Sequence, residues 1–90
     1  MVRIEEDVKD LQFAGDASLD YVTIGENVNR IGEKAFAKCQ NLIAIRIEES
    51  DKPIRISFDY VNGCKNLVEV SIKRKVEFFK NYKIKGAKYL

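Results

Sequence analysis

Two cysteines and one acidic cluster are the residues of this chain whose types could support catalysis or metal binding. Cys39 and Cys64 could act as nucleophiles or metal ligands, and a group of carboxylates at 48–51 could serve in acid–base chemistry. The chain has no histidine, which is the usual general base, the usual partner of a cysteine nucleophile and the commonest zinc ligand. Two cysteines alone cannot complete a structural zinc site. We therefore expect no catalytic residue, no metal and no other cofactor, and a protein that is not an enzyme.

The acidic cluster belongs to a polar segment, EESDKP (48–53), that we expect to form a loop on the rim of the molecule. Nothing in this segment predicts the burial that would raise a carboxylate pKa for acid catalysis. The spacing of Glu48, Glu49 and Asp51 also differs from that of an EF-hand. We interpret the cluster as a solvated loop.

Four blocks of the chain share one apolar pattern at their first, sixth and last positions. The blocks are VKDLQFAGDASL (8–19), IGEKAFAKCQNL (31–42), ISFDYVNGCKNL (56–67) and FKNYKIKGAKYL (79–90). Their first positions are Val8, Ile31, Ile56 and Phe79, and their last positions are Leu19, Leu42, Leu67 and Leu90. The first position recurs at spacings of 23, 25 and 23 residues, a period typical of stacked repeats.

Each of the first three blocks leads into an alternating apolar segment: LDYVTI (19–24), LIAIRI (42–47) and LVEVSI (67–72). A period of two in β-branched residues indicates half-buried strands. The segment VRI (2–4) is similar to a shortened first copy. We expect these strands to stack in one parallel sheet, with a short second strand near 28–31 and 76–79. A helical turn should then bring Phe36 inward.

The two cysteines occupy the same position in adjacent blocks. A disulfide between the repeats would need Cα atoms within about 7 Å and converging Cβ vectors. The alternative, which we favour, is a pair of buried thiols that pack as small hydrophobic side chains. The fourth block has Ala87 at this position, which fits the second interpretation.

The segment VTIGENVNRIGEKAFAKCQNLIAIRI (22–47) resembles the BspA-type leucine-rich repeat family. The matching positions are Ile31, Gly32, Ala35, Phe36, Cys39, Leu42, Ile45 and Ile47. The resemblance implies an α+β repeat fold: a short leucine-rich-repeat solenoid of about four rungs. A parallel sheet would form one face, and turns or short helical segments the other. We expect residues 1–90 to form a single domain. Members of the family typically use the solenoid to bind other proteins or surfaces, and many are secreted or lie on the cell surface.

The compartment depends on whether Met1 is the native start. No apolar run approaches the roughly 20 residues that a membrane span needs. The opening MVRIEEDVKD has acidic residues where a signal peptide has basic and apolar ones. We therefore expect a cytoplasmic protein without membrane contact if Met1 is native. Otherwise the chain is a fragment of a secreted or cell-surface protein.

The outward side of the predicted parallel sheet is our candidate protein-binding surface. Stacking the strands places outward side chains in two rows, one through Ala44 and one through Arg46. The expected contact residues are Arg3, Tyr21, Thr23, Arg46, Glu69 and Ser71. Tyrosine and arginine are enriched at binding hot spots. Alternatively, Arg46 and Glu69 only neutralise each other across the face. The surface predicts a non-catalytic protein–protein interaction module, either a small adaptor or an inhibitor of a larger enzyme or complex.

The C-terminal segment is basic and admits a different partner. Residues 73–90 carry seven Lys/Arg and one Glu, whereas residues 1–72 carry nine Lys/Arg and thirteen Asp/Glu. The candidate contacts are Lys73, Arg74, Lys75, Phe78, Tyr82 and Tyr89. Basic residues with interleaved aromatic rings are typical of nucleic-acid binding through phosphates and stacking. Lysines that cap an open sheet edge are the competing interpretation.

Two further expectations concern this last repeat. The block alignment places Phe78 in the position held by Arg30 and Arg55 in earlier repeats, so we expect its ring to be exposed or used in a contact. Leu90 occupies the position that elsewhere begins a strand. We therefore expect either a longer protein or a homo-oligomer formed through this end.

Overall fold

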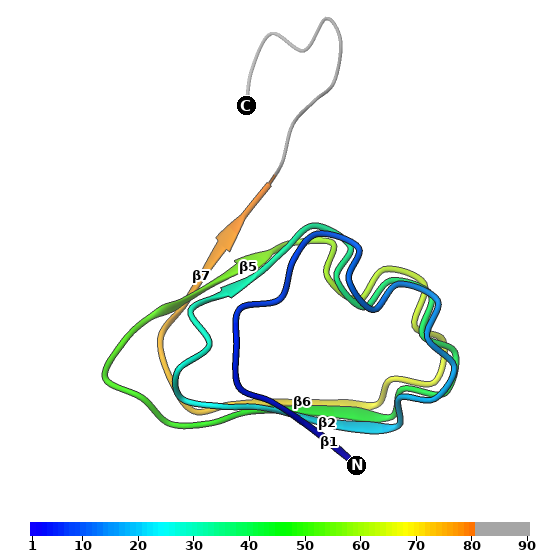
Figure 1. The fold of residues 1–90 in the computed structure, drawn as a ribbon, viewed down its shortest axis with the longest axis horizontal. Coiled ribbons are helices and arrows are strands. Elements are labelled where there is room, and N and C mark those ends of the chain that lie inside the picture. Colours follow the sequence, from blue (N-terminus) through cyan, green and yellow to red (C-terminus); the bar gives the residue numbers. More distant parts are fainter. Residues whose placement is uncertain (81–90) are drawn as a thin grey trace, which may run out of the picture.

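The computed structural model of the protein describes residues 1–80 of the 90-residue chain. Its strands are β1 (Val2–Ile4), β2 (Tyr21–Ile24), β3 (Arg30–Ile31), β4 (Ala44–Ile47), β5 (Ile54–Ser57), β6 (Glu69–Ile72) and β7 (Val76–Phe79). They form two sheets, with strand orders β1-β2-β4-β6 and β3-β5-β7, and every pairing is parallel. The chain winds as a solenoid with one sheet on each of two sides and stacked turns on the third (Figure 1).

We call each passage around the axis a coil. The first coil spans residues 2–19, the second 20–42 and the third 43–67, and residues 68–80 begin the next one. The first coil is short: only three residues separate Ile4 from Val8, which bridges to Ile31 in the second coil. The described residues thus form three coils and the start of another. The completion of a fourth rung by the block at 79–90 falls outside the described residues.

The third side of the solenoid is built from turns; of the turns or short helical segments expected there, the described residues form only the turns. No helix forms within residues 1–80, so the expected α+β class is corrected for these residues to an all-β parallel solenoid. The same residues contain no helix that could cross a membrane. The backbone donors explain why turns form instead of a helix. The N–H of Phe13 donates to the carbonyl of Ala35, and the N–H of Phe36 to that of Tyr60, both at 2.8 Å. These N–H groups bond to the next coil instead of four residues back, as a helix would require.

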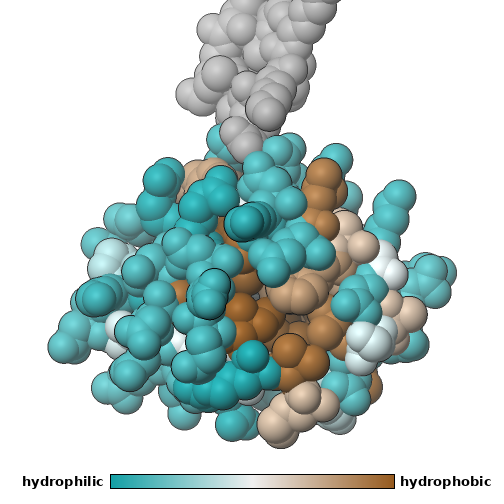
Figure 2. Space-filling model, viewed as in Figure 1, coloured by the Kyte–Doolittle hydropathy of each residue, from teal (hydrophilic) through white to brown (hydrophobic). Residues whose placement is uncertain are grey.

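The inward side chains form columns that run through the coils, as the alternating segments predicted. β2 pairs with β4 and β4 with β6 so that Val22 lies against Ile45 and Ile45 against Val70. Along the three strands β2, β4 and β6, Ile24, Ile47 and Ile72 form the neighbouring column. Seen down the stack, the middle of the molecule is apolar and its rim is hydrophilic (Figure 2). Burial of these columns between coils supplies the hydrophobic stabilisation.

The register of β7 differs by one residue from the block alignment. Phe78, rather than Phe79, pairs with Ile56, and Glu77 takes the place beside Arg55. Our expectation that Phe78 shares the position of Arg30 and Arg55 was therefore wrong. A one-residue slip turns every side chain of a strand to the opposite face. The observed register points Val76 and Phe78 inward and leaves the charged Glu77 exposed, whereas the expected one would have turned this carboxylate toward the apolar interior.

Phe79 gains cationic partners from this register. It lies on the outward face of the second sheet, where the guanidinium carbons of Arg30 and Arg55 lie 5.2 and 5.0 Å from its ring centroid. Cations over an aromatic face within about 6 Å attract the ring. The observed register thus keeps the Glu77 carboxylate off the apolar side and adds a favourable contact on the surface.

Phe36 is the central side chain of the core. It is fully buried, and its ring stacks on that of Phe13 with centroids 5.4 Å apart and planes 5° from parallel. The two phenylalanines come from the same block position in the first and second coils, so the stack joins one coil to the next.

We predict that Phe36→Ala lowers the free energy of unfolding by about 3–5 kcal/mol, because it removes a large buried ring and leaves a cavity between coils. Urea denaturation followed by circular dichroism measures the change. Phe58→Ala is the matched control, because Phe58 is 53% exposed and its loss should cost about 1 kcal/mol or less. Equal losses in the two variants would contradict the central role of Phe36.

A buried arginine joins the loops on the rim of the solenoid. Arg74 is only 9% exposed. Its Nε donates to the carbonyl of Lys52 at 2.8 Å, and its Nη1 donates to the carbonyl of Val28 at 2.9 Å. Longer contacts of 3.3–3.4 Å reach the carbonyls of Glu26 and Pro53 and the side-chain oxygen of Asn29. One guanidinium therefore satisfies acceptors from the rim loops of two preceding coils.

Replacing Arg74 by alanine should lower the free energy of unfolding by about 2–3 kcal/mol, because the buried carbonyl of Val28 and the part-buried carbonyl of Lys52 lose a charged donor. Thermal and urea denaturation measure the effect. Lys75→Ala is the control, because Lys75 is exposed and its truncation should change stability by about 0.5 kcal/mol or less. An Arg74→Ala variant as stable as the control would show that the rim does not depend on this residue.

Candidate binding surface

The outward face of the four-stranded sheet carries the two rows of side chains that we expected. Tyr21, Ala44 and Glu69 are register partners across β2, β4 and β6, and so are Thr23, Arg46 and Ser71. Arg3 extends the second row because it pairs with Thr23. The hydrogen-bonded ladder holds all of these positions in one plane.

A hollow of about 330 Å³ lies on this face. The residues that line it are Met1, Tyr21, Val22, Thr23, Ala44, Ile45, Arg46, Glu69, Ser71 and Lys73. Five of the six candidate contacts thus line one concavity, and Arg3 is the exception. Met1 and Lys73 are lining residues that our reasoning from the sequence missed. The even alternation of the strand could have shown that Lys73 continues the outward side of β6.

Tyr21 and Arg46 are the two side chains of this hollow whose types are most typical of binding hot spots. Tyr21 is 49% exposed. Arg46 is exposed, and within residues 1–80 it forms no ion pair within 4 Å, so the expected neutralisation by Glu69 is not seen. Its charge acts only at longer range, on Glu48. The hollow therefore combines an aromatic ring with a cation that lacks a close counter-charge.

Arg3 already has partners within the chain. Its guanidinium donates two hydrogen bonds of 2.7 Å to the carboxylate of Glu48 and also contacts Glu5. The hydrogen bonds from Arg3, more than the weaker charge of Arg46, hold the pKa of Glu48 below its usual range. Arg3 thus joins the first coil to the third at the side of the face, and its charge is paired with Glu5 and Glu48.

The basic C-terminal candidates are scattered by the fold. Lys73 and Lys75 are exposed, but Arg74 between them is buried under the rim loops. Phe78 is 58% exposed and tilts against Tyr60 with ring centroids 6.4 Å apart. Tyr82 and Tyr89 lie outside the described residues. Arg74 is therefore removed from the set of residues that could contact phosphates, because its donors are already bonded.

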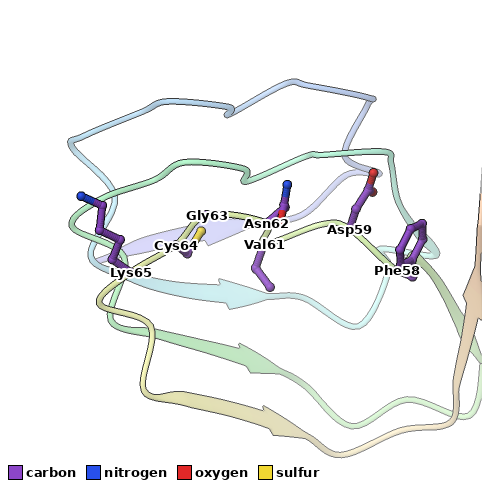
Figure 3. Close-up of a pocket in the computed structure, with 7 residues that line it drawn as sticks. All are labelled: Phe58, Asp59, Val61, Asn62, Gly63, Cys64 and Lys65. Atoms are coloured by element: carbon purple, nitrogen blue, oxygen red, sulfur yellow. The ribbon is translucent and has the colours of Figure 1, made fainter.

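A second hollow, of about 390 Å³, lies along the turns of the third coil (Figure 3). It is lined by Phe58, Asp59, Val61, Asn62, Gly63, Cys64 and Lys65, which follow one another along one segment. The backbone N–H groups of Val61 and Gly63 have no hydrogen-bond partner among residues 1–80. In the two coils above, Phe13 and Phe36 use the equivalent N–H to bond to the next coil. This hollow is thus the open end of the column of turns.

Both cysteines are free thiols in adjacent coils. Each Sγ donates to a backbone carbonyl of the preceding coil: Cys39 to Phe13 at 3.1 Å, and Cys64 to Phe36 at 3.0 Å. Cys39 is fully buried, and this burial raises the pKa of its thiol. Cys64 lies at the open end and is partly exposed. The described residues contain no group of three or more side chains placed to hold a metal ion.

The difference in burial predicts two phases of thiol modification with Ellman's reagent. Cys64 should react within minutes in the native state, whereas Cys39 should react only when the protein unfolds, because a buried thiol seldom forms the reactive thiolate. Cys64→Ser should abolish the fast phase and leave the slow one. Two equally fast thiols would show that the core between the second and third coils opens readily.

These features define a class of protein: a parallel solenoid whose repeats stack leucine and phenylalanine columns and leave one sheet face free. The family model for the BspA type leucine rich repeat region (6 copies) matches residues 5–90, and the chain belongs to this family. Leucine-rich repeats generally mediate protein–protein interaction. No curated protein and no solved structure matches the chain.

Proposed function

We propose that this protein is a non-catalytic protein-binding module and that its partner contacts the outward face of the four-stranded sheet. The observation that carries the proposal is the hollow on that face. It gathers Tyr21, Thr23, Arg46, Glu69 and Ser71, which come from three different coils.

The physical properties of the face support this role. A half-exposed tyrosine and an arginine that has no ion pair among residues 1–80 provide the residue types that dominate interface energetics. The ladder of β2, β4 and β6 already orders their backbone, so little conformational entropy is lost when a partner binds. The core columns lie on the other side of these strands, so substitutions on the outward face leave the packing intact.

A small module of this kind can serve as an adaptor or as an inhibitor that covers part of a larger enzyme or complex, and we propose these two roles together. The partner decides between them. The role is compatible with either compartment expected from the sequence, the cytoplasm or the cell surface.

Nucleic-acid binding through the basic segment is the alternative function. Lys73 and Lys75 are exposed and Phe78 offers part of its ring, which favours it, but the donors of Arg74 are bonded inside the protein. Salt separates the two functions. Binding through phosphates weakens steeply between about 50 and 200 mM salt, whereas a protein interface centred on Tyr21 changes modestly.

We predict that Tyr21→Ala/Arg46→Ala weakens binding to the partner by at least about tenfold, because it removes both expected hot-spot side chains. Proteins captured by the wild type and lost with this variant would be purified, and their binary affinities measured by isothermal titration calorimetry at two salt concentrations.

The matched control is Phe58→Ala/Arg55→Ala, which removes an exposed aromatic ring and an arginine from other sides of the solenoid. It should bind the same partners as the wild type. If both double variants keep the full set of partners, the sheet face is not the binding site. The alternative function holds instead if both double variants bind an oligonucleotide as the wild type does and if this binding is lost at about 200 mM salt.

A further inference from the structure

The end of the solenoid formed by β6 and β7 leaves its apolar columns uncovered within the described residues. Ile24 and Ile47 are fully buried, but Ile72, at the end of the same column, is 40% exposed. Ile56 is likewise fully buried, and its partner Phe78 is 58% exposed. Strand β6 has a paired edge toward β4 and, among residues 1–80, an unpaired opposite edge.

The opposite end is closed differently. The short first coil keeps Val8 at 1% and Leu19 at 2% exposure, and Ile4 at 9%, although no coil lies above them. Met1 and Leu11 at this end are 91% and 59% exposed, but the inward Ile4, which ends the column of Ile24 and Ile47 on this side, stays buried. Strand β1 is also an edge of this sheet, but among the described residues the exposed end of the inward column, Ile72, lies at the β6 edge. An edge with an exposed apolar column is suited to a contact between two like ends.

The side chains of residues 69–73 alternate so that this segment can pair with an antiparallel copy of itself. Val70 and Ile72 point toward the core, whereas Glu69, Ser71 and Lys73 all line the hollow on the outward face. Glu69 precedes Ser71 by two residues and Lys73 follows it by two. A second β6 placed antiparallel, with Ser71 opposite Ser71, therefore sets each Glu69 against a Lys73.

We propose that two copies of this chain associate through a two-fold axis at Ser71, joining their β6 strands into one continuous sheet. The outward side then gains two Glu69–Lys73 pairs, and the inward side gains two Val70–Ile72 contacts. Cross-strand pairs of both kinds stabilise antiparallel strands. A lysine on an edge strand normally discourages pairing with another strand. Here Lys73 lies opposite Glu69 of the second copy, and this pairing favours the proposed register over others.

Neighbouring registers lack this agreement. Centring the axis on Val70 puts Glu69 against Ser71 and leaves Lys73 without a carboxylate opposite. Moving by half a step sets outward Glu69 against inward Ile72, which mismatches the two faces. The contact uses the same surface on both copies, so it closes at two and does not propagate into a fibre.

Relative to the view in Figure 1, the two-fold rotation also exchanges the left and right sides of the second copy. It carries β7 of that copy toward residues 58–65 of the first. The exposed ring of Phe78 then faces the open hollow that Val61 and Cys64 help to line. The same movement thus brings together the remaining uncovered apolar groups of both ends.

The test is the mass of the full chain in solution, by sedimentation equilibrium up to about 1 mM, where even weak contacts are populated. The wild type should reach twice its 10.3 kDa monomer mass. Glu69→Lys and Lys73→Glu should each weaken association by at least about tenfold, because like charges then oppose each other twice. The double variant should restore the dimer, and mixing the two single variants should give a mixed dimer.

Two controls make the outcome specific. Glu6→Lys and Lys9→Glu make the same charge changes at exposed N-terminal positions and should leave the dimer intact. Ser71→Cys should form an intermolecular disulfide under mild oxidation, because directly opposite Cα atoms lie about 4.5–5.5 Å apart in antiparallel pairs. Thr23→Cys, which lies two strands away, should not.

A monomer at every concentration would overturn the proposal and indicate that other residues of the same chain, 81–90 included, cover the end. A dimer that both charge reversals leave unchanged, or one in which Ser71→Cys does not cross-link, would also overturn it. None of these measurements needs the partner of the sheet face, so the result is independent of the proposed binding function.

Discussion

Every coil of this protein depends on its neighbours, because a single coil can neither bury its apolar side nor satisfy its own backbone. Side chains in the column through Val22, Ile45 and Val70 are fully shielded from water only where another coil lies on each side. The turns obey the same constraint through hydrogen bonds, since Phe13 and Phe36 donate their N–H groups to the next coil. Hydrophobic stacking and backbone hydrogen bonding thus act along one axis and stabilise the same arrangement.

This constraint explains where polar chemistry occurs inside the molecule. The two thiols donate to carbonyls of the preceding coil, and Arg74 gathers carbonyls of the rim loops where the coils differ in length. In each case a donor is placed where the stack leaves an acceptor without a strand partner. These internal polar groups of the described residues are therefore structural, whereas the residues that we propose to bind a partner lie on the outward sheet face.

The constraint also makes the two ends unequal. The N-terminal coil is shortened and keeps Ile4, Val8 and Leu19 buried, whereas Ile72 and Phe78 are exposed at the other end. The sheet face and this end share Glu69, Ser71 and Lys73. A contact between two ends would extend the sheet and lengthen the binding face, so self-association and partner binding would use adjoining parts of one surface.

Periodicity in the sequence was sufficient to predict the repeat, the parallel order of the long strands and the rows through Ala44 and Arg46. Those features follow from side-chain alternation, which is local and repeats in each block. The slip of β7, the burial of Arg74 and the pairing of Arg3 with Glu48 depended on tertiary structure. Each is decided by residues at least 20 positions apart, whose approach is set by loop lengths that differ between coils. A pattern read along the chain identifies which face a residue favours within its own strand. Only the packing of the coils determines which distant carbonyl, carboxylate or ring that residue contacts.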